Sequence, residues 1–175
     1  MNISDLRLFL SGRNSIRRYQ DREVEPSLID QITSLASLAP TAGNIESWDI
    51  VVVTDLTSRE DLANAALNQE HIAQAPVVLV VCANYVRSMA KYSDRGILYA
   101  LEDATIAGTY LMLGAHAAGL ACCWTGAFDD EMVRDILGLP VHIRPVTLLT
   151  IGYGAEAAIS PARRDIKEHI HRDGW

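Results

Sequence analysis

Cysteine and long hydrophobic runs are both scarce in this 175-residue chain. The three cysteines include no C-x-x-C pair, which favours buried thiols in a reducing compartment over a disulfide framework. The longest apolar run, residues 75–83, is far shorter than the roughly 20 residues needed to span a bilayer. The N-terminus shows no apolar segment of signal-peptide length. We therefore expect a cytoplasmic protein without a transmembrane helix.

Positive charge is also in short supply, because 15 Lys and Arg stand against 22 Asp and Glu, giving a net charge of -7. Nucleic acids and anionic membranes repel such a surface, so neither is an expected partner. One local exception is the segment 13–18, which carries Arg13, Arg17 and Arg18. The hydrophobic content of 49% is typical of a chain that folds around a core, and the length suits one domain spanning residues 1–175.

Hydrophobic periodicity predicts helices and strands mixed along the chain. Helices are expected at residues 4–12, at 26 to just before Pro40, at 58–69 and at 129–138, with Ser4, Ser58 and Asp129 as N-caps. Residues 85–96 should be irregular or partly helical. Residues 153–175 are polar and form a tail that must pack on another surface or stay loose.

Four strands are expected, at residues 48–54, 76–83, 120–125 and 145–152. The first two are β-branched apolar runs, which predicts central strands buried on both faces. A long helix over residues 97–118 carries two neighbouring apolar stripes and many Ala and Gly residues. It should therefore be central and pack closely on other helices, including one from a second subunit. The fold class is mixed α and β, with helices around one small sheet.

Two motifs suggest chemistry that their context does not support. Residues 152–157 fit G-x-G-x-x-A after a strand, but Ser160 and Pro161 interrupt the helix that a dinucleotide-binding turn requires, and few residues remain. His169 and His171 could face one side of a strand, yet the sequence offers no clear third metal ligand. We expect neither a Rossmann site nor a metal site.

The basic segment allows two interpretations that composition alone does not separate. Arg13, Arg17 and Arg18 could be a solvated charge run. Alternatively, their guanidinium groups and the Ser15 hydroxyl could hold a phosphate dianion.

Five stretches, in order, resemble the flavin-dependent nitroreductase family. They are RNSIRRY at 13–19, APTAGNIESW at 39–48, APVV at 75–78, GLACCWTGAF at 119–128, and IGYG at 151–154 with PARR at 161–164. The resemblance spans nearly the whole chain. It implies a small, mostly antiparallel sheet flanked by helices, with a long central helix, in a homodimer that holds FMN at its interface.

The resemblance also assigns cofactor-binding residues, and it favours the phosphate clamp over the solvated run. The clamp would comprise Arg13, Ser15 and Arg17 with Arg163 and Arg164, and the Asn14 backbone would meet the flavin edge. The flavin of the partner subunit would be reached by Pro40, Thr41 and Asn44. The pyrimidine end of the flavin would be contacted by Asn68 and His71. The other face of the flavin ring would be contacted by Trp124, Thr125 and Gly126. For Trp124 and Gly126, packing and turn geometry are equally good explanations. The tail 153–175 would pack on the partner subunit.

Two departures from the family pattern bear on the chemistry. Glu46 and Ser47 replace the family's Gln-Pro, and His71 stands where a permanent cation is often found, so its charge should disappear as pH rises across neutrality. The resemblance implies ping-pong electron transfer from NADH or NADPH through FMN to a nitroaromatic, a quinone or a similar acceptor. No protein side chain is then required as a catalytic acid or base. The alternative is a flavin-binding or flavin-processing protein without NAD(P)H oxidase activity.

Overall fold

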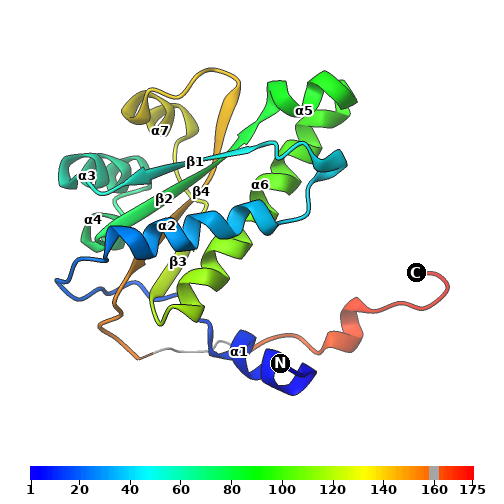
Figure 1. The fold of residues 1–175 in the computed structure, drawn as a ribbon, viewed down its shortest axis with the longest axis horizontal. Coiled ribbons are helices and arrows are strands. Elements are labelled where there is room, and N and C mark those ends of the chain that lie inside the picture. The colour runs from blue at the N-terminus through cyan, green and yellow to red at the C-terminus, as the bar shows by residue number, and fades with distance from the viewer. Residues whose placement is uncertain (158–161) are drawn as a thin grey trace.

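A four-stranded antiparallel sheet lies at the centre of the computed structural model, which describes residues 1–157 and 162–175 (Figure 1). The strands are β1 (Trp48–Val53), β2 (Val77–Asn84), β3 (Ala121–Thr125) and β4 (Ile143–Gly152), in the spatial order β1-β2-β4-β3. All three strand pairs run antiparallel. The mixed fold class and the antiparallel sheet are thus confirmed.

Helices cover both faces of the sheet, giving three layers. One face carries α2 (Pro26–Ser34), the 3-10 turn η1 (Leu35–Leu38) and α6 (Arg95–Ala117), and the other carries α3 (Leu56–Ala65), α4 (His71–Gln74) and α7 (Asp130–Leu137). The remaining elements are α1 (Ile3–Gly12), α5 (Tyr85–Tyr92) and two 3-10 turns, η2 (Ala42–Asn44) and η3 (Ile166–His169). None of the helices in the described ranges is long and apolar enough to cross a membrane.

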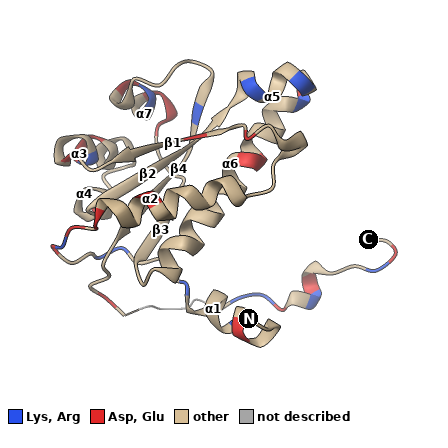
Figure 2. Cartoon of the chain, viewed as in Figure 1, with Lys and Arg blue, Asp and Glu red and all other residues tan. Residues whose placement is uncertain are grey.

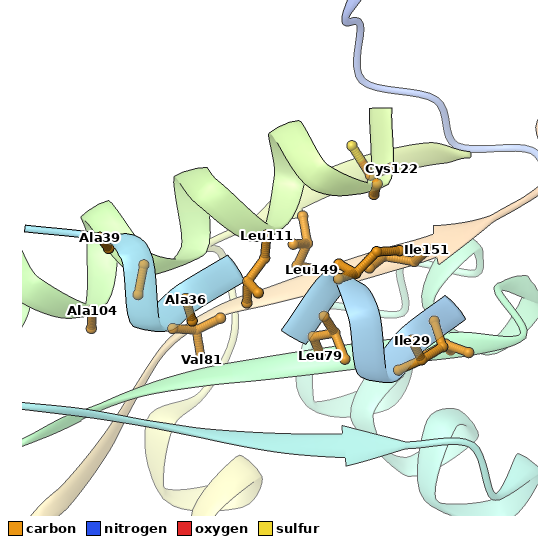
Figure 3. Close-up of a cluster of buried hydrophobic side chains, with 14 of the residues drawn as sticks. Ile29, Ala36, Ala39, Leu79, Val81, Ala104, Leu111, Cys122, Leu149 and Ile151 are labelled. Atoms are coloured by element: carbon orange, nitrogen blue, oxygen red, sulfur yellow. The ribbon is translucent and has the colours of Figure 1, made fainter. Parts of the chain in front are cut away.

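The period-two alternation of β2 divides the core between the two faces. Leu79 and Val81 pack beneath α2 and α6, together with Leu111 of the long helix (Figure 3). Val78 and Val80 point the other way, into the cluster under α3, α4 and α7. Every residue of β2 is buried, as expected for a central strand.

The expectation that residues 48–54 form a central strand is wrong. β1 lies at the edge of the described sheet, and Val52 remains 46% exposed. A β-branched apolar run identifies a strand, but not how many neighbours that strand has, because partner choice depends on distant parts of the chain.

Two N-caps differ from the sequence-based prediction. α1 begins at Ile3, and its N-cap is Asn2, which forms a capping box with Asp5. α3 begins at Leu56, because Asp55 accepts the backbone N–H of Ser58, and the helix ends at Ala65 instead of about residue 69. In both cases an earlier polar residue competes successfully for the capping role. The cap of α7 by Asp129 and its end at Gly138 are confirmed.

The long helix α6 starts two residues earlier than expected and lies along one face of the sheet. Its first apolar stripe is largely buried through Ala104, Gly108, Leu111 and Ala115, although Ile97 is 41% exposed. Its second stripe is only half-buried at Ile106, Tyr110 and Leu113. We expected both apolar stripes of α6 to be buried. Within one chain, only the first stripe is largely buried.

Candidate functional site

The basic segment after α1 is fixed to the sheet by main-chain hydrogen bonds. The Ile16 N–H donates to the Cys122 carbonyl of β3 at 3.1 Å, and the Ala155 N–H, just past β4, donates to the Arg18 carbonyl at 2.9 Å. The segment therefore runs between β3 and the exit of β4, where the side chains of Ser15 and Arg17 are exposed. Figure 2 shows Lys and Arg colouring along this stretch between α1 and α2.

Tyr19 anchors the end of this segment in the core. Its hydroxyl donates to the Ile16 carbonyl at 2.9 Å and lies 2.6 Å from Thr150 Oγ1. Burial raises the Tyr19 pKa, so the hydroxyl stays protonated. A Cβ at Gly152 would lie 2.9 Å from Cδ1 of Tyr19 and 2.6 Å from Cδ of Pro76. Gly152 thus serves close packing at the strand exit, which gives the glycine motif a structural purpose.

A cleft of about 590 Å³ opens beside the basic segment. It is lined by Arg17, Arg18, Tyr19, Glu70, His71, Gln74 and Ala155. His71 is only 6% exposed, and its Nε2 lies 3.0 Å from Oγ1 of Thr125. The structure therefore brings together three residues that the sequence predicted for one site, namely Arg17, His71 and Thr125.

The protonation state of His71 differs from the sequence-based expectation. Burial lowers its pKa below the usual 6.5, and the charge of Arg17 lowers it further. His71 is thus neutral at neutral pH in the flavin-free chain. The expectation that its charge disappears as pH rises across neutrality is therefore wrong, because the charge is already lost at lower pH. The cationic side chains that line this cleft are Arg17 and Arg18.

A smaller cleft of about 300 Å³ lies on the other side of the segment and contains Arg13 and Asn14. His116 and Glu156 also line it, and neither was identified from the sequence. The Glu156 carboxylate accepts the Arg17 backbone N–H at 2.8 Å, and His116 Nε2 lies 2.9 Å from the Phe9 carbonyl. No sequence signal predicts the Glu156 contact, because 139 positions separate its partners.

Trp124 and Gly126 lie at the end of β3, next to the long helix. A Cβ at Gly108 of α6 would lie 2.9 Å from the Trp124 ring, so this ring packs directly on the helix backbone. Trp124 is half-buried and Gly126 exposed.

Asn68 lies apart from the cleft beside His71. It is exposed, with φ at 58°, and it lines a neighbouring hollow with Glu60 and Asn64.

The loop with Pro40, Thr41 and Asn44 lies far from the basic segment of the same chain. It contacts α6 at Asp103, whereas the basic segment lies beside His116 near the other end of that helix. At 1.5 Å per residue, these two positions are about 20 Å apart along the helix axis. One chain alone therefore does not assemble all the predicted residues around one point.

Arg163 and Arg164 are exposed, as are residues 155–157 and all of 162–175. The tail extends away from the sheet in Figure 1. Ser160 and Pro161 lie outside the described residues.

The three cysteines are buried, as the sequence predicted. Burial raises the pKa of the Cys122 thiol to about 11 and that of Cys82 to about 12, so both stay protonated at neutral pH. In the part of the chain that the structure describes, no three His, Cys, Asp or Glu side chains are placed to share a metal ion.

Comparison with known proteins identifies the family. The model of the nitroreductase family matches residues 10–70 and 65–153, which covers most of the chain and most residues that line the two clefts. The chain belongs to the nitroreductase family. It is 34% identical over 172 residues to an NADH dehydrogenase of Thermus thermophilus, covering 82% of this chain and 84% of that protein.

Two further nitroreductase relatives resemble almost the whole chain. One, from Bacillus subtilis, is named FMN reductase (NAD(P)H); it is 27% identical over 180 residues, with 95% of this chain and 72% of that protein covered. The other is the solved structure of an FMN-dependent nitroreductase from Clostridium difficile R20291. It is 28% identical and superposes with a TM-score of 0.81, covering 95% of this chain and 98% of the other.

Proposed function

We propose that this chain is an FMN-dependent oxidoreductase that takes electrons from NADH or NADPH and passes them to a nitroaromatic, a quinone or a similar small acceptor. The family and the names of the relatives support this class of activity. The observation that carries the proposal is the basic segment, which is hydrogen-bonded to β3 and to the residues just past β4 and presents cationic side chains beside a cleft.

The residues around this segment fit an FMN phosphate. Arg13 and Arg17 supply guanidinium forks, which bind phosphate oxygens through charge-assisted hydrogen bonds, and Ser15 supplies a hydroxyl. Their backbone is fixed before any ligand arrives, so little conformational entropy is lost on binding. Arg163 and Arg164 add positive charge from the tail. We assign the phosphate clamp to these five residues.

The cleft that His71 lines suits the flavin ring. When bound, FMN supplies the capacity to accept a hydride equivalent from reduced nicotinamide and to release electrons to a second substrate. Arg17 keeps a permanent positive charge at the cleft, which stabilises negative charge there by Coulomb attraction. His71 is neutral, and its hydrogen bond with the Thr125 hydroxyl orients the His71 ring. Asn14, Asn68, Trp124 and Gly126 do not line this cleft, and their proposed contact with the flavin rests on the family resemblance.

We also propose that the working form is a homodimer. The loop with Pro40, Thr41 and Asn44 and the basic segment of the same chain meet α6 at points about 20 Å apart along the helix axis, which favours a second copy as the source of the loop at each flavin. The exposed tail, with Ile166 and Ile170, and α6, with the exposed Ile97 and its half-buried second stripe, offer apolar surface for that contact.

The clamp is tested by changing Arg13 and Arg17 together to Ala. Each lost charge-assisted hydrogen bond costs about 1.5–3 kcal/mol, so we expect FMN to bind at least about a hundredfold more weakly. The measurement is flavin fluorescence during FMN titration of the flavin-free protein. The matched control changes Arg7 and Arg95, two exposed arginines outside the basic segment, to Ala. A double variant that retains stoichiometric FMN would contradict the clamp.

Bleaching of bound FMN by NADH or NADPH separates the proposed activity from the alternative function. A flavin-binding or flavin-processing protein without oxidase activity would also be yellow but would not bleach. A steady-state screen with both nicotinamides, against a nitroaromatic and a quinone, then identifies the donor and the acceptor class. Parallel lines in double-reciprocal plots are expected for ping-pong turnover.

A further inference from the structure

The loop that follows η1 adopts a backbone conformation with unusual strain. Gly43, Asn44 and Glu46 all have positive φ, at 60°, 59° and 53°. Left-handed backbone is costly for residues other than glycine, and it persists only where the surroundings hold it in place. The Asn44 and Glu46 conformations therefore need an external support, and two charged side chains supply one.

The first support is Asp103, a buried carboxylate of α6 that is 2% exposed. Its Oδ1 accepts the Ala42 N–H at 2.8 Å, and its Oδ2 accepts the Ser47 N–H at 3.2 Å. One carboxylate thus binds both ends of the strained stretch, with each oxygen taking one end. A buried carboxylate needs such donors, because it would otherwise lose its hydration without compensation.

The second support is Arg87 of α5, on the opposite side of the loop. Its Nη1 donates to the Glu46 carbonyl at 2.5 Å and to the Trp48 carbonyl at 3.1 Å. Its Nη2 pairs with Asp49 at 3.2 Å, and Asp49 in turn accepts a hydrogen bond from Asn84 at 2.7 Å. The guanidinium is therefore oriented by strand residues before it reaches the loop.

We propose that Asp103 and Arg87 are positioning residues for the flavin site, an inference that rests on the proposed function. They hold residues 41–47 in the strained shape that presents Thr41 and Asn44 to the flavin of the partner subunit. Neither side chain touches the cofactor. Asp103 acts through the backbone at Ala42 and Ser47, and Arg87 acts through the carbonyl of Glu46.

The test uses Asp103→Asn and Arg87→Gln in the full chain, with Glu102→Gln and Arg95→Gln as charge-matched controls on exposed positions of α6. Asparagine keeps the shape of aspartate but turns one acceptor into a donor that faces a backbone N–H. Hydrogen exchange of the flavin-free protein reports the loop directly. We expect the Ser47 amide to exchange at least about tenfold faster in Asp103→Asn than in wild type or in Glu102→Gln.

The flavin-loaded proteins provide the readout that a merely structural role would not change. Both positioning variants should alter the visible circular dichroism of bound FMN and lower kcat at saturating donor, while the clamp retains FMN. Arg87→Gln serves as the second arm, because Arg87 is 42% exposed and its loss is tolerated more easily than a core change. If Asp103→Asn does not fold, Arg87→Gln decides the inference.

The outcomes separate this inference from the proposed function. Unchanged amide exchange together with unchanged flavin dichroism and kcat in the variants that fold would overturn the positioning role. Failure of wild-type protein to bind FMN, or to be bleached by NADH and NADPH, would overturn the proposed function. Faster exchange in the loop with no change in the flavin signals would show a purely structural support and would also overturn the inference.

Discussion

The buried hydrogen bond between His71 and Thr125 can be removed with little change in shape by Thr125→Val. His71 is 6% exposed and Thr125 4%, so water does not readily replace the lost partner. Leaving a buried polar group unsatisfied costs about 1–3 kcal/mol, so we expect Thr125→Val to lower the free energy of unfolding by about 2 kcal/mol. An unfolding entropy of about 2.1 cal/mol/K per residue gives about 0.37 kcal/mol/K for this chain, and hence a fall in Tm of about 5 °C.

The same site predicts a pH dependence with a definite sign. Burial lowers the His71 pKa in the folded chain, whereas the unfolded chain keeps an ordinary value near 6.5. Below about pH 6.5 the unfolded chain therefore binds more protons, and the free energy of unfolding falls as pH falls. His71→Gln cannot titrate and lacks this component. The stability advantage of wild type over His71→Gln should thus be largest at about pH 8 and shrink towards about pH 5.

Urea unfolding of the flavin-free proteins, followed by circular dichroism at both pH values, measures the free energies of unfolding, and thermal unfolding measures the change in Tm. Thr105→Val is the matched control, because the Thr105 hydroxyl is exposed and bonds only its own helix, at the Leu101 carbonyl. The control should change the free energy of unfolding by less than about 0.5 kcal/mol. A Thr125→Val protein as stable as its control would refute the buried hydrogen bond. Parallel pH profiles for wild type and His71→Gln would refute the lowered pKa.

Further predictions concern packing, capping and assembly. Gly108→Ala should lower the free energy of unfolding by about 1–2 kcal/mol in urea, because the steric clash with the Trp124 ring outweighs the higher helix propensity of Ala. A variant as stable as wild type would contradict this contact. Asp129→Ala should cost about 1 kcal/mol by losing the cap of α7, whereas the exposed Asp135→Ala should cost less than about 0.5 kcal/mol. Light scattering should give the mass of a dimer, and an active monomer that holds FMN would refute the dimer.

Local sequence patterns correctly predicted most of the helices and strands. A continuous run of β-branched apolar residues marked β2, and the Asp129 and Gly138 boundaries of α7 followed from capping chemistry. These signals succeed because they depend on neighbours within one or two turns. They failed where two nearby polar residues could each cap a helix, as at α1, where Asn2 took the role expected of Ser4.

The family and the basic segment could be recognised from residues in sequence, and in the structure Arg17 and His71 line one cleft, with Thr125 hydrogen-bonded to His71. The neutral state of His71 could not be predicted, because desolvation depends on what the fold places around a side chain. Sequence reasoning likewise gave Asp103 no role, since a carboxylate inside an apolar helix shows its purpose only once its partners are known.

The sequence by itself therefore determined the order of the elements, the family and the chemical character of the basic segment. Tertiary structure alone decided that β1 is an edge strand, that Glu156 meets the Arg17 backbone, and that Asp103 holds a loop about sixty positions away. The physical reason is the range of the interactions. Turns, caps and side-chain periodicity act between near neighbours, whereas strand order, desolvation and contacts between distant segments arise only when the whole chain packs.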